Sequence, residues 1–201
     1  MQAHNKATEW FDALYKKHEN NHENIPWASK DVNKHLKSYL DAREEHKGRA
    51  LVIGCGLGDD AYALAKAGYD VVAIDVSQTA LNLAKKRFSG VTIAFEKQDI
   101  FDMPSKYDAD FDFVFEALTI QSLPREFRGK IIQAIVKSVA LQGKLLVVAH
   151  KQNRVFDGPP WPLKDEDMTL FKEEGMKEVE FDIIQESSKI SDIKFRVLYE
   201  K

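Results

Sequence analysis

Residues 50–61 read Ala-Leu-Val-Ile-Gly-Cys-Gly-Leu-Gly-Asp-Asp-Ala, an apolar run that ends in three glycines at alternate positions. This spacing constrains the fold, because a strand that turns sharply into a helix needs residues without a Cβ. A ligand that lies against the backbone has the same requirement. The next apolar run, residues 70–75, ends in Asp75. A glycine-rich turn followed by this acid predicts a nucleotide-type cofactor site at the edge of an α/β sheet.

Size, charge and cysteine content narrow the class of protein. The chain has 201 residues, 44% of them hydrophobic, which is enough for one α/β domain and short for two. Its net charge of −3 disfavours nucleic acid or an anionic membrane as partner. The single cysteine, Cys55, excludes an intramolecular disulfide and a cysteine-based zinc cluster, which fits a reducing compartment. Because the first residues lack an apolar signal core and no stretch approaches 18 apolar residues, we expect a cytoplasmic protein.

Hydrophobic periodicity predicts strands that alternate with helices, and therefore a parallel sheet. Two amphipathic helices are expected first, near residues 7–14 and 32–40. Strands are then predicted at 50–54, 70–74, 91–96, 111–115 and 144–149, with helices at 59–67, 77–88 and 125–140. A short helix at 165–174 precedes a terminal antiparallel hairpin, 179–183 and 193–199, each strand with one buried face. We expect an α/β, Rossmann-like, seven-stranded mostly parallel sheet with a C-terminal antiparallel hairpin and helices on both faces.

The residues after the glycines discriminate between cofactors. A dinucleotide-binding turn would need glycine or alanine at position 59, where this chain has Asp59 followed by Asp60. Two carboxylates at a helix N-terminus would repel a pyrophosphate and attract a ligand with an ammonium group and a sulfonium centre. S-adenosylmethionine (SAM) is therefore favoured, and an NAD-binding oxidoreductase is the less favoured alternative.

These residues resemble the class I SAM-dependent methyltransferases, through Val52–Asp59, Asp75 and Gln98-Asp99-Ile100. The resemblance covers roughly residues 48–201 and implies a role for each position. The glycines would approach the methionine part of SAM, Asp75 would accept hydrogen bonds from the ribose, and Asp99 would accept one from the adenine amine. The cofactor-binding residues that it implies are Gly54, Cys55, Gly56, Leu57, Gly58, Asp75, Val76, Asp99, Ile100, Glu116, Ala117 and Trp10.

Within this superfamily the chain looks most like the small-molecule group that includes thiopurine, thiol/halide and tellurite methyltransferases. The supporting segments are Trp10, Ile25-Pro26-Trp27 and Asp157-Gly158-Pro159-Pro160-Trp161. Ala28-Ser29 departs from the usual pattern of that group, which leaves the substrate open. The residues expected to line the substrate pocket are Trp27, Gln121, His150 and Trp161.

The resemblance implies one methyltransferase domain, with residues 1–47 as an N-terminal helical lid or substrate segment and 48–201 as the SAM-binding core. The expected reaction is methyl transfer to a small molecule, with a thiol, thiopurine or halide favoured. Such acceptors need no strong base, so no catalytic residue is predicted. For an oxygen or nitrogen acceptor the nearest candidate bases are His150 and Glu116. A non-catalytic SAM-binding module is the alternative, because a fold alone does not establish chemistry.

Three further features allow two interpretations each. Residues 18–22 match H-E-x-x-H, a zinc-protease signature, but the segment is polar on every side, so we expect a solvated helix end and no metal. Cys55 lacks a neighbouring base and is expected to pack rather than react. Trp10, Phe11 and Trp27 either cap the sheet or form a lid over SAM and the substrate.

Overall fold

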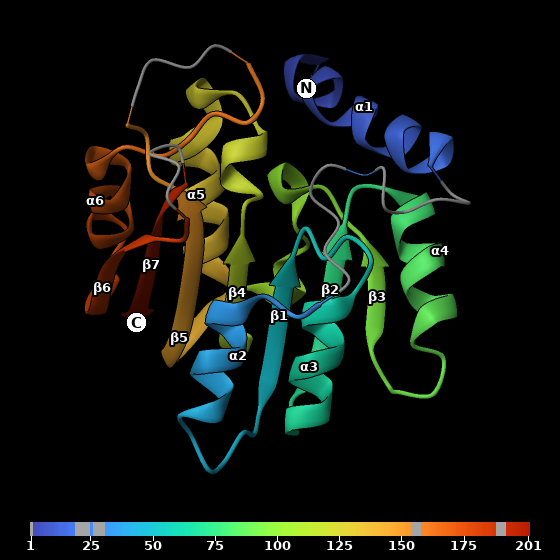
Figure 1. Cartoon of the computed structure of the whole chain (residues 1–201), viewed down its shortest axis with the longest axis horizontal. Helices are drawn as coiled ribbons and strands as arrows, with labels where there is room; N and C mark the ends of the chain where they lie inside the picture. Colours follow the sequence, from blue (N-terminus) through green and yellow to red (C-terminus); the bar gives the residue numbers. More distant parts are fainter. Residues whose placement is uncertain (1, 19–24, 26–30, 154–157, 188–191) are drawn as a thin grey trace. The chain divides into compact units, whose positions relative to one another are not determined.

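The computed structural model describes residues 2–18, 25, 31–153, 158–187 and 192–201, and only the backbone of residues 2–7. Seven strands form one sheet in the order β3-β2-β1-β4-β5-β7-β6 (Figure 1). The strand pairs β1–β2, β2–β3 and β4–β5 are parallel, and β7 runs antiparallel to both β5 and β6. The predicted fold class is therefore confirmed. Contacts within the chain divide it into two compact units, residues 1–102 and 103–201.

The first unit consists of three parallel strands and the helices that connect or precede them. Strands β1 and β2 are buried along almost their whole length, as expected for a parallel sheet that is covered on both faces. Helix α4 begins after Ser77, whose Oγ accepts a hydrogen bond from Ala80 N at 3.1 Å. The elements are α1 (Gln2–Lys17), α2 (Lys34–Asp41), β1 (Arg49–Ile53), α3 (Asp59–Ala67), β2 (Asp70–Asp75), α4 (Gln78–Arg87), β3 (Ala94–Lys97) and the 3-10 helix η2 (Ile100–Asp102).

The second unit contains the other four strands. Helix α6 covers β7, because Phe171 stacks on Tyr199 with ring centroids 4.9 Å apart and the Tyr199 hydroxyl donates to Met168 O. The elements are η3 (Ser105–Tyr107), β4 (Phe111–Ala117), η4 (Ile120–Ser122), η5 (Arg125–Phe127), α5 (Arg128–Ser138), β5 (Val139–His150), α6 (Asp165–Glu173), β6 (Lys177–Gln185) and β7 (Ile193–Glu200).

The predicted boundaries differ from the observed ones mainly around α5 and β5. The predicted helix 125–140 is shorter, because residues 125–127 form η5 and Val139 already pairs with Phe111 of β4. Strand β5 therefore begins five residues before the predicted start at 144 and runs through a register irregularity opposite β4. Val139 is β-branched, and such residues favour the extended conformation that pairing with Phe111 requires.

The prediction that both hairpin strands bury one face is wrong for β6. Its apolar residues Val179, Phe181 and Ile183 are 47%, 38% and 52% exposed. Phe181 pairs with Val197 of β7 and Ile183 with Phe195, and both of these β7 residues are fully buried. The difference arises because β6 is the edge strand of the sheet, and alternation predicts which side chains share a face but not whether that face is covered.

Within the described part of the chain, every helix is too short or too polar to cross a membrane.

Candidate functional site

The glycine turn between β1 and α3 has the conformation that its sequence predicts. Gly54, Gly56 and Gly58 all have positive φ angles, of 62°, 51° and 88°. Residues with a Cβ rarely adopt this left-handed region. A Cβ at Gly58 would also lie 3.0 Å from Ala84 Cβ and 3.2 Å from the Phe95 ring. At position 58, glycine is therefore required both by the backbone conformation and by close packing.

Asp75, the last residue of β2, is bound directly to this turn. One carboxylate oxygen, Oδ2, accepts a hydrogen bond from Gly56 N at 2.9 Å, and Oδ1 accepts one from Ser77 N at 2.8 Å. Burial raises the pKa of Asp75, and the hydrogen bonds from Ser77, Gly56 and Val76 oppose this shift. A carboxylate has about four lone-pair sites, so Asp75 can still accept a hydrogen bond from a hydroxyl group of a ligand.

The neighbouring strand brings a second acid to the same edge of the sheet. Asp75 pairs with Lys97 of β3, and Gln98 N donates to Asp75 O at 3.1 Å. Asp99 follows, and its Oδ1 accepts a hydrogen bond from Phe101 N at 3.0 Å, which shapes the start of η2. Ile100 is buried in this turn, whereas Val76 is half-buried after β2. The residues predicted to bind the ribose and the adenine, Asp75 and Asp99, therefore lie at or just after the ends of two adjacent strands, β2 and β3.

Asp59 and Asp60 were expected to attract a cationic ligand, but both carboxylates are bound to other parts of the chain. Asp59 forms a two-bond ion pair with Arg87, the last residue of α4, with N–O distances of 2.6 and 2.8 Å. Arg87 also donates to Leu57 O at 2.7 Å, so it holds the turn from the far end of α4. Asp60 Oδ1 accepts from Asn33 N at 2.7 Å, and burial raises the pKa of Asp60 to about 6. The two acids thus stabilise the turn rather than present charge to a ligand.

Cys55 and Leu57 fill the space beneath the turn. Both are buried, and Cys55 N donates to Ile74 O at 2.9 Å. Burial, together with the charge of Asp75, raises the pKa of the Cys55 thiol well above its usual value. A thiol held protonated is a weak nucleophile, in agreement with the packing role expected for Cys55.

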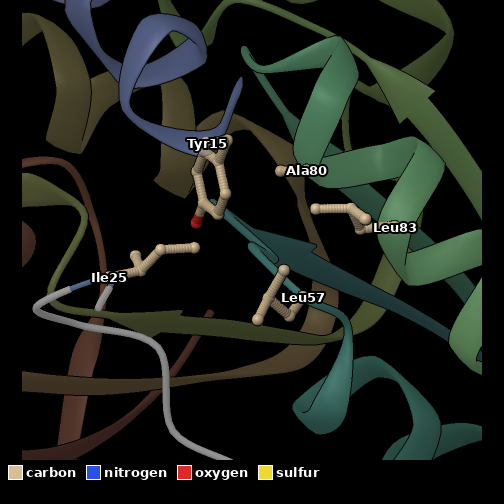
Figure 2. Close-up of a cluster of buried hydrophobic side chains, with 5 residues drawn as sticks. All are labelled: Tyr15, Ile25, Leu57, Ala80 and Leu83. Atoms are coloured by element: carbon tan, nitrogen blue, oxygen red, sulfur yellow. The ribbon is translucent and has the colours of Figure 1, made fainter. Parts of the chain in front are cut away.

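Helix α1 packs on the glycine turn through residues that the sequence reasoning missed. Figure 2 shows Tyr15 directed from α1 into a cluster with Ile25, Leu57, Ala80 and Leu83. A Cβ added at Gly56 would lie 3.0 Å from the Tyr15 hydroxyl. The spacing of seven residues between the buried side chains Thr8 and Tyr15 could have indicated this face.

Of the three aromatic residues that were considered for a lid, the structure describes Trp10 and Phe11 but not Trp27. Trp10 is half-buried on α1 and stacks on Phe11, with ring centroids 4.0 Å apart. Trp27 lies outside the described residues, as do Glu19 and His22 of the H-E-x-x-H segment. Among the described residues, no group of three or more potential ligands could hold a metal ion.

In the second unit, Glu116 is a fully buried carboxyl group near the end of β4. Its Oε1 accepts hydrogen bonds from Thr119 N at 2.7 Å and Ile120 N at 3.0 Å, and Ala117 beside it is half-buried. Its Oε2 has no hydrogen-bond partner among the described residues. Burial raises the pKa of Glu116 to about 7 against the effect of the two amides, so this carboxyl group titrates near neutral pH.

Gln121 connects the predicted substrate residues of this unit. Its side-chain Oε1 accepts from His150 N at 2.7 Å, and its backbone carbonyl accepts from Trp161 N at 2.6 Å. Arg128 in turn donates to the Trp161 carbonyl and pairs with Asp167. The structure thus brings Gln121, His150 and Trp161 together, but through the backbones of His150 and Trp161 rather than through their rings.

The His150 imidazole is half-buried at the end of β5. Burial and the charge of Lys194 lower its pKa, while Asp192 and Glu186 act in the opposite direction. Lys194 is itself paired with Glu186 at 2.8 Å. A neutral imidazole can accept a proton, so His150 has the protonation state that a base requires at neutral pH.

Comparison with known proteins places the chain in a family. The family model "Thiopurine S-methyltransferase (TPMT)" matches residues 15–200. Thiocyanate methyltransferase 1 from Arabidopsis thaliana is 27% identical over 153 residues, or 74% of this chain and 65% of that protein. Thiopurine S-methyltransferase from Legionella pneumophila (strain Corby) is 27% identical over 164 residues, or 73% of this chain and 74% of that protein. The chain thus spans less than two thirds of the Arabidopsis relative.

Solved structures agree with the fold. The N-methyltransferase NodS from Bradyrhizobium japonicum WM9, in complex with S-adenosyl-L-homocysteine, has a TM-score of 0.74 and 19% sequence identity. The alignment covers 94% of this chain and 97% of that one. At this level of identity the likeness shows a shared methyltransferase fold and nothing about the substrate.

Proposed function

Because the chain belongs to the thiopurine S-methyltransferase family, we propose that it transfers the methyl group of SAM to a small-molecule acceptor. The observation that supports this most strongly is the bond between Gly56 N and Asp75 Oδ2. It joins a left-handed glycine turn to an acid at a strand end, and a nucleoside cofactor needs both features in one place.

The residues of the first unit fit SAM by their donor and acceptor chemistry. Asp75 would accept a hydrogen bond from a ribose hydroxyl at the lone-pair site that its backbone partners leave. Asp99 would accept one from the adenine amine, with Val76 and Ile100 beside the ring. The glycines, which have no side chain, would let the methionine part approach the backbone at residues 54–58.

The proposed methyl transfer requires the protein mainly to bind and orient SAM and the acceptor. SAM, when bound, supplies a methyl group that is already activated by its sulfonium centre. The chain then has to orient the cofactor, bring the acceptor into line and exclude water. The glycine turn and Asp75 serve the first task, and α1 over the turn serves the last. We propose residues 1–47 as the segment that covers this site and 48–201 as the SAM-binding core.

The favoured acceptors are thiols, thiopurines and halides, because such nucleophiles react without a dedicated base. The names of the Arabidopsis and Legionella relatives support this class. For an acceptor that must lose a proton, His150 is the preferred base, since its pKa is lowered and its ring is half-buried. Glu116 is the second candidate, although its Oε1 already holds a turn. A cytoplasmic location is proposed on the single, buried Cys55.

A turnover screen tests this function. Purified protein is incubated with SAM and a panel of thiols, thiopurines, halides and small phenols, and release of S-adenosylhomocysteine is measured. We expect release that depends on both SAM and a sulfur or halide acceptor. Saturable SAM binding without turnover on any acceptor would instead favour the non-catalytic binding module. NADH binding without any response to SAM would support the oxidoreductase alternative.

A further inference from the structure

One residue of α1 caps the N-terminus of another helix. Asp12 Oδ1 accepts hydrogen bonds from Ser77 Oγ at 2.8 Å and from Thr79 N, in the first turn of α4, at 3.0 Å. Asp12 Oδ2 lies 2.9 Å from Lys16 Nζ. The first amides of a helix have no intrahelical partner and carry partial positive charge, so a carboxylate is favoured there. Burial acts to raise the pKa of Asp12, but these hydrogen bonds outweigh it and lower the pKa, so Asp12 is charged at neutral pH.

The same contact leads to the predicted ribose acid. Ser77 donates from its hydroxyl to Asp12 and from its backbone N to Asp75 Oδ1, while Asp75 Oδ2 binds Gly56 N. The Asp12 charge also raises the pKa of Asp75. Helix α1 is therefore linked to the glycine turn through Ser77 and Asp75.

A second contact between α1 and the turn lies one helical turn along. Tyr15 is 2% exposed in its cluster (Figure 2), and a Cβ added at Gly56 would lie 3.0 Å from the Tyr15 hydroxyl. Asp12 and Tyr15 are three residues apart and so lie on neighbouring positions of one helix face. Figure 1 places α1 beside the first turn of α4, in agreement with these bonds. Docking of α1 and the position of the turn are thus set by a polar and an apolar contact together.

We propose that Asp12 is a positioning residue that couples docking of α1 to occupancy of the cofactor site. The inference rests on the proposed function, since the ligand that it invokes is SAM. A ligand that binds Asp75 stabilises the arrangement of residues 75–77 on which α1 docks. By reciprocity, docked α1 strengthens binding of that ligand by the same factor.

The test uses the full-length chain and the variants Asp12→Ala, Asp12→Asn and Glu9→Ala. Glu9→Ala is the matched control, because Glu9 is an exposed acid on the same helix. SAM affinity is measured by isothermal titration, and α1 docking by the rate of trypsin cleavage at the exposed Lys16 and Lys17, with and without SAM. The loss of the charge-assisted bonds in Asp12→Ala is expected to weaken SAM binding about tenfold.

Cleavage distinguishes coupling from a general loss of stability. We expect SAM to slow cleavage of the wild-type protein and of Glu9→Ala severalfold, but to protect Asp12→Ala little. Asp12→Asn keeps an oxygen acceptor and is expected to be intermediate in both measurements. In a Ser77→Ala background, which keeps the backbone bond to Asp75, Asp12→Ala should weaken SAM binding by a smaller factor than in the wild type.

The outcomes separate this inference from the function on which it rests. A wild-type protein that does not bind SAM would overturn the proposed function, and the coupling with it. A wild-type protein that binds SAM, while Asp12→Ala keeps both its affinity and its protection, would overturn the coupling alone.

Discussion

The two units hold their predicted site residues in different ways. In the first, Gly56, Asp75 and Ser77 contact one another directly, through backbone amides that donate to one carboxylate. In the second, Gln121 reaches His150 and Trp161 only through their backbones. The first arrangement presents a turn and a carboxylate to a ligand, whereas the second fixes the backbones of His150 and Trp161 and not their rings.

The largest expected effect concerns the framework of the second unit. Arg128 is 4% exposed, pairs with Asp167 and donates to Trp161 O and Pro162 O. Arg128→Ala removes the ionic partner of Asp167 and the donor to both carbonyls, and is expected to lower the free energy of unfolding by about 3–5 kcal/mol. Lys130→Ala, an exposed cation on the same helix, is the control and should change it little. Equal urea midpoints for both variants would contradict this account of the framework.

The next effect tests the first unit through its glycine turn. Gly58→Ala places a Cβ at φ +88°, against Ala84 and Phe95. We expect a loss of about 2–4 kcal/mol in the free energy of unfolding, from backbone strain and overpacking. Gly129→Ala, in α5 with open space around it, should be neutral or stabilise by up to about 1 kcal/mol. Thermal unfolding of both variants measures the contrast.

A third change tests ligand binding in the first unit. Asp75→Ala removes the proposed ribose acceptor and also leaves Gly56 N and Ser77 N without their partner. SAM binding is expected to weaken by about 1–3 kcal/mol. Asp70→Ala, at the exposed opposite end of β2, should bind SAM with wild-type affinity. Unchanged affinity in Asp75→Ala would remove the ribose assignment.

The smallest effect is a pH dependence that arises in the second unit. The pKa of Glu116 is raised from 4.5 to about 7 in the fold. The folded protein thus holds this proton more tightly than the unfolded chain, so the contribution of Glu116 to stability is fully present below about pH 4.5 and is lost as the pH rises through about 7. Glu116→Gln keeps an acceptor for Thr119 N and Ile120 N without the charge. It should therefore be more stable than the wild type at pH 8, by about 1–3 kcal/mol, and equal to it near pH 4.5.

Urea unfolding at the two pH values measures this effect, with the exposed Glu126→Gln as control. If Glu116→Gln gave the same stability difference at both pH values, the buried carboxyl would not be the titrating group.

Much of the first unit could be predicted because its contacts follow from short-range patterns. The glycines and Asp75 are placed by the strand ends that carry them, and adjacent parallel strands bring Asp99 to the same edge. The ion pair of Asp59 could not be predicted in this way, since Arg87 lies 28 residues away at the C-terminal end of α4. The same holds for Asp12, which is 67 residues from Thr79.

The second unit was harder to predict because the environment, not the pattern, decides its features. The alternation of apolar and polar residues identified the apolar face of β6. Only the place of β6 at the edge of the sheet explains why Phe181 is exposed while its partner Val197 is buried. Positions 121, 150 and 161 were expected to line a pocket, and nothing in their spacing indicated that Gln121 would use its side-chain oxygen to hold a strand end. Substrate contact by these residues stays a prediction.

Isothermal titration of the wild-type protein with SAM shows whether the glycine turn and Asp75 form a SAM site. We expect saturable binding at one site per chain, with an affinity better than millimolar that falls in Asp75→Ala and not in Asp70→Ala. Absence of saturable binding at millimolar SAM would contradict this expectation.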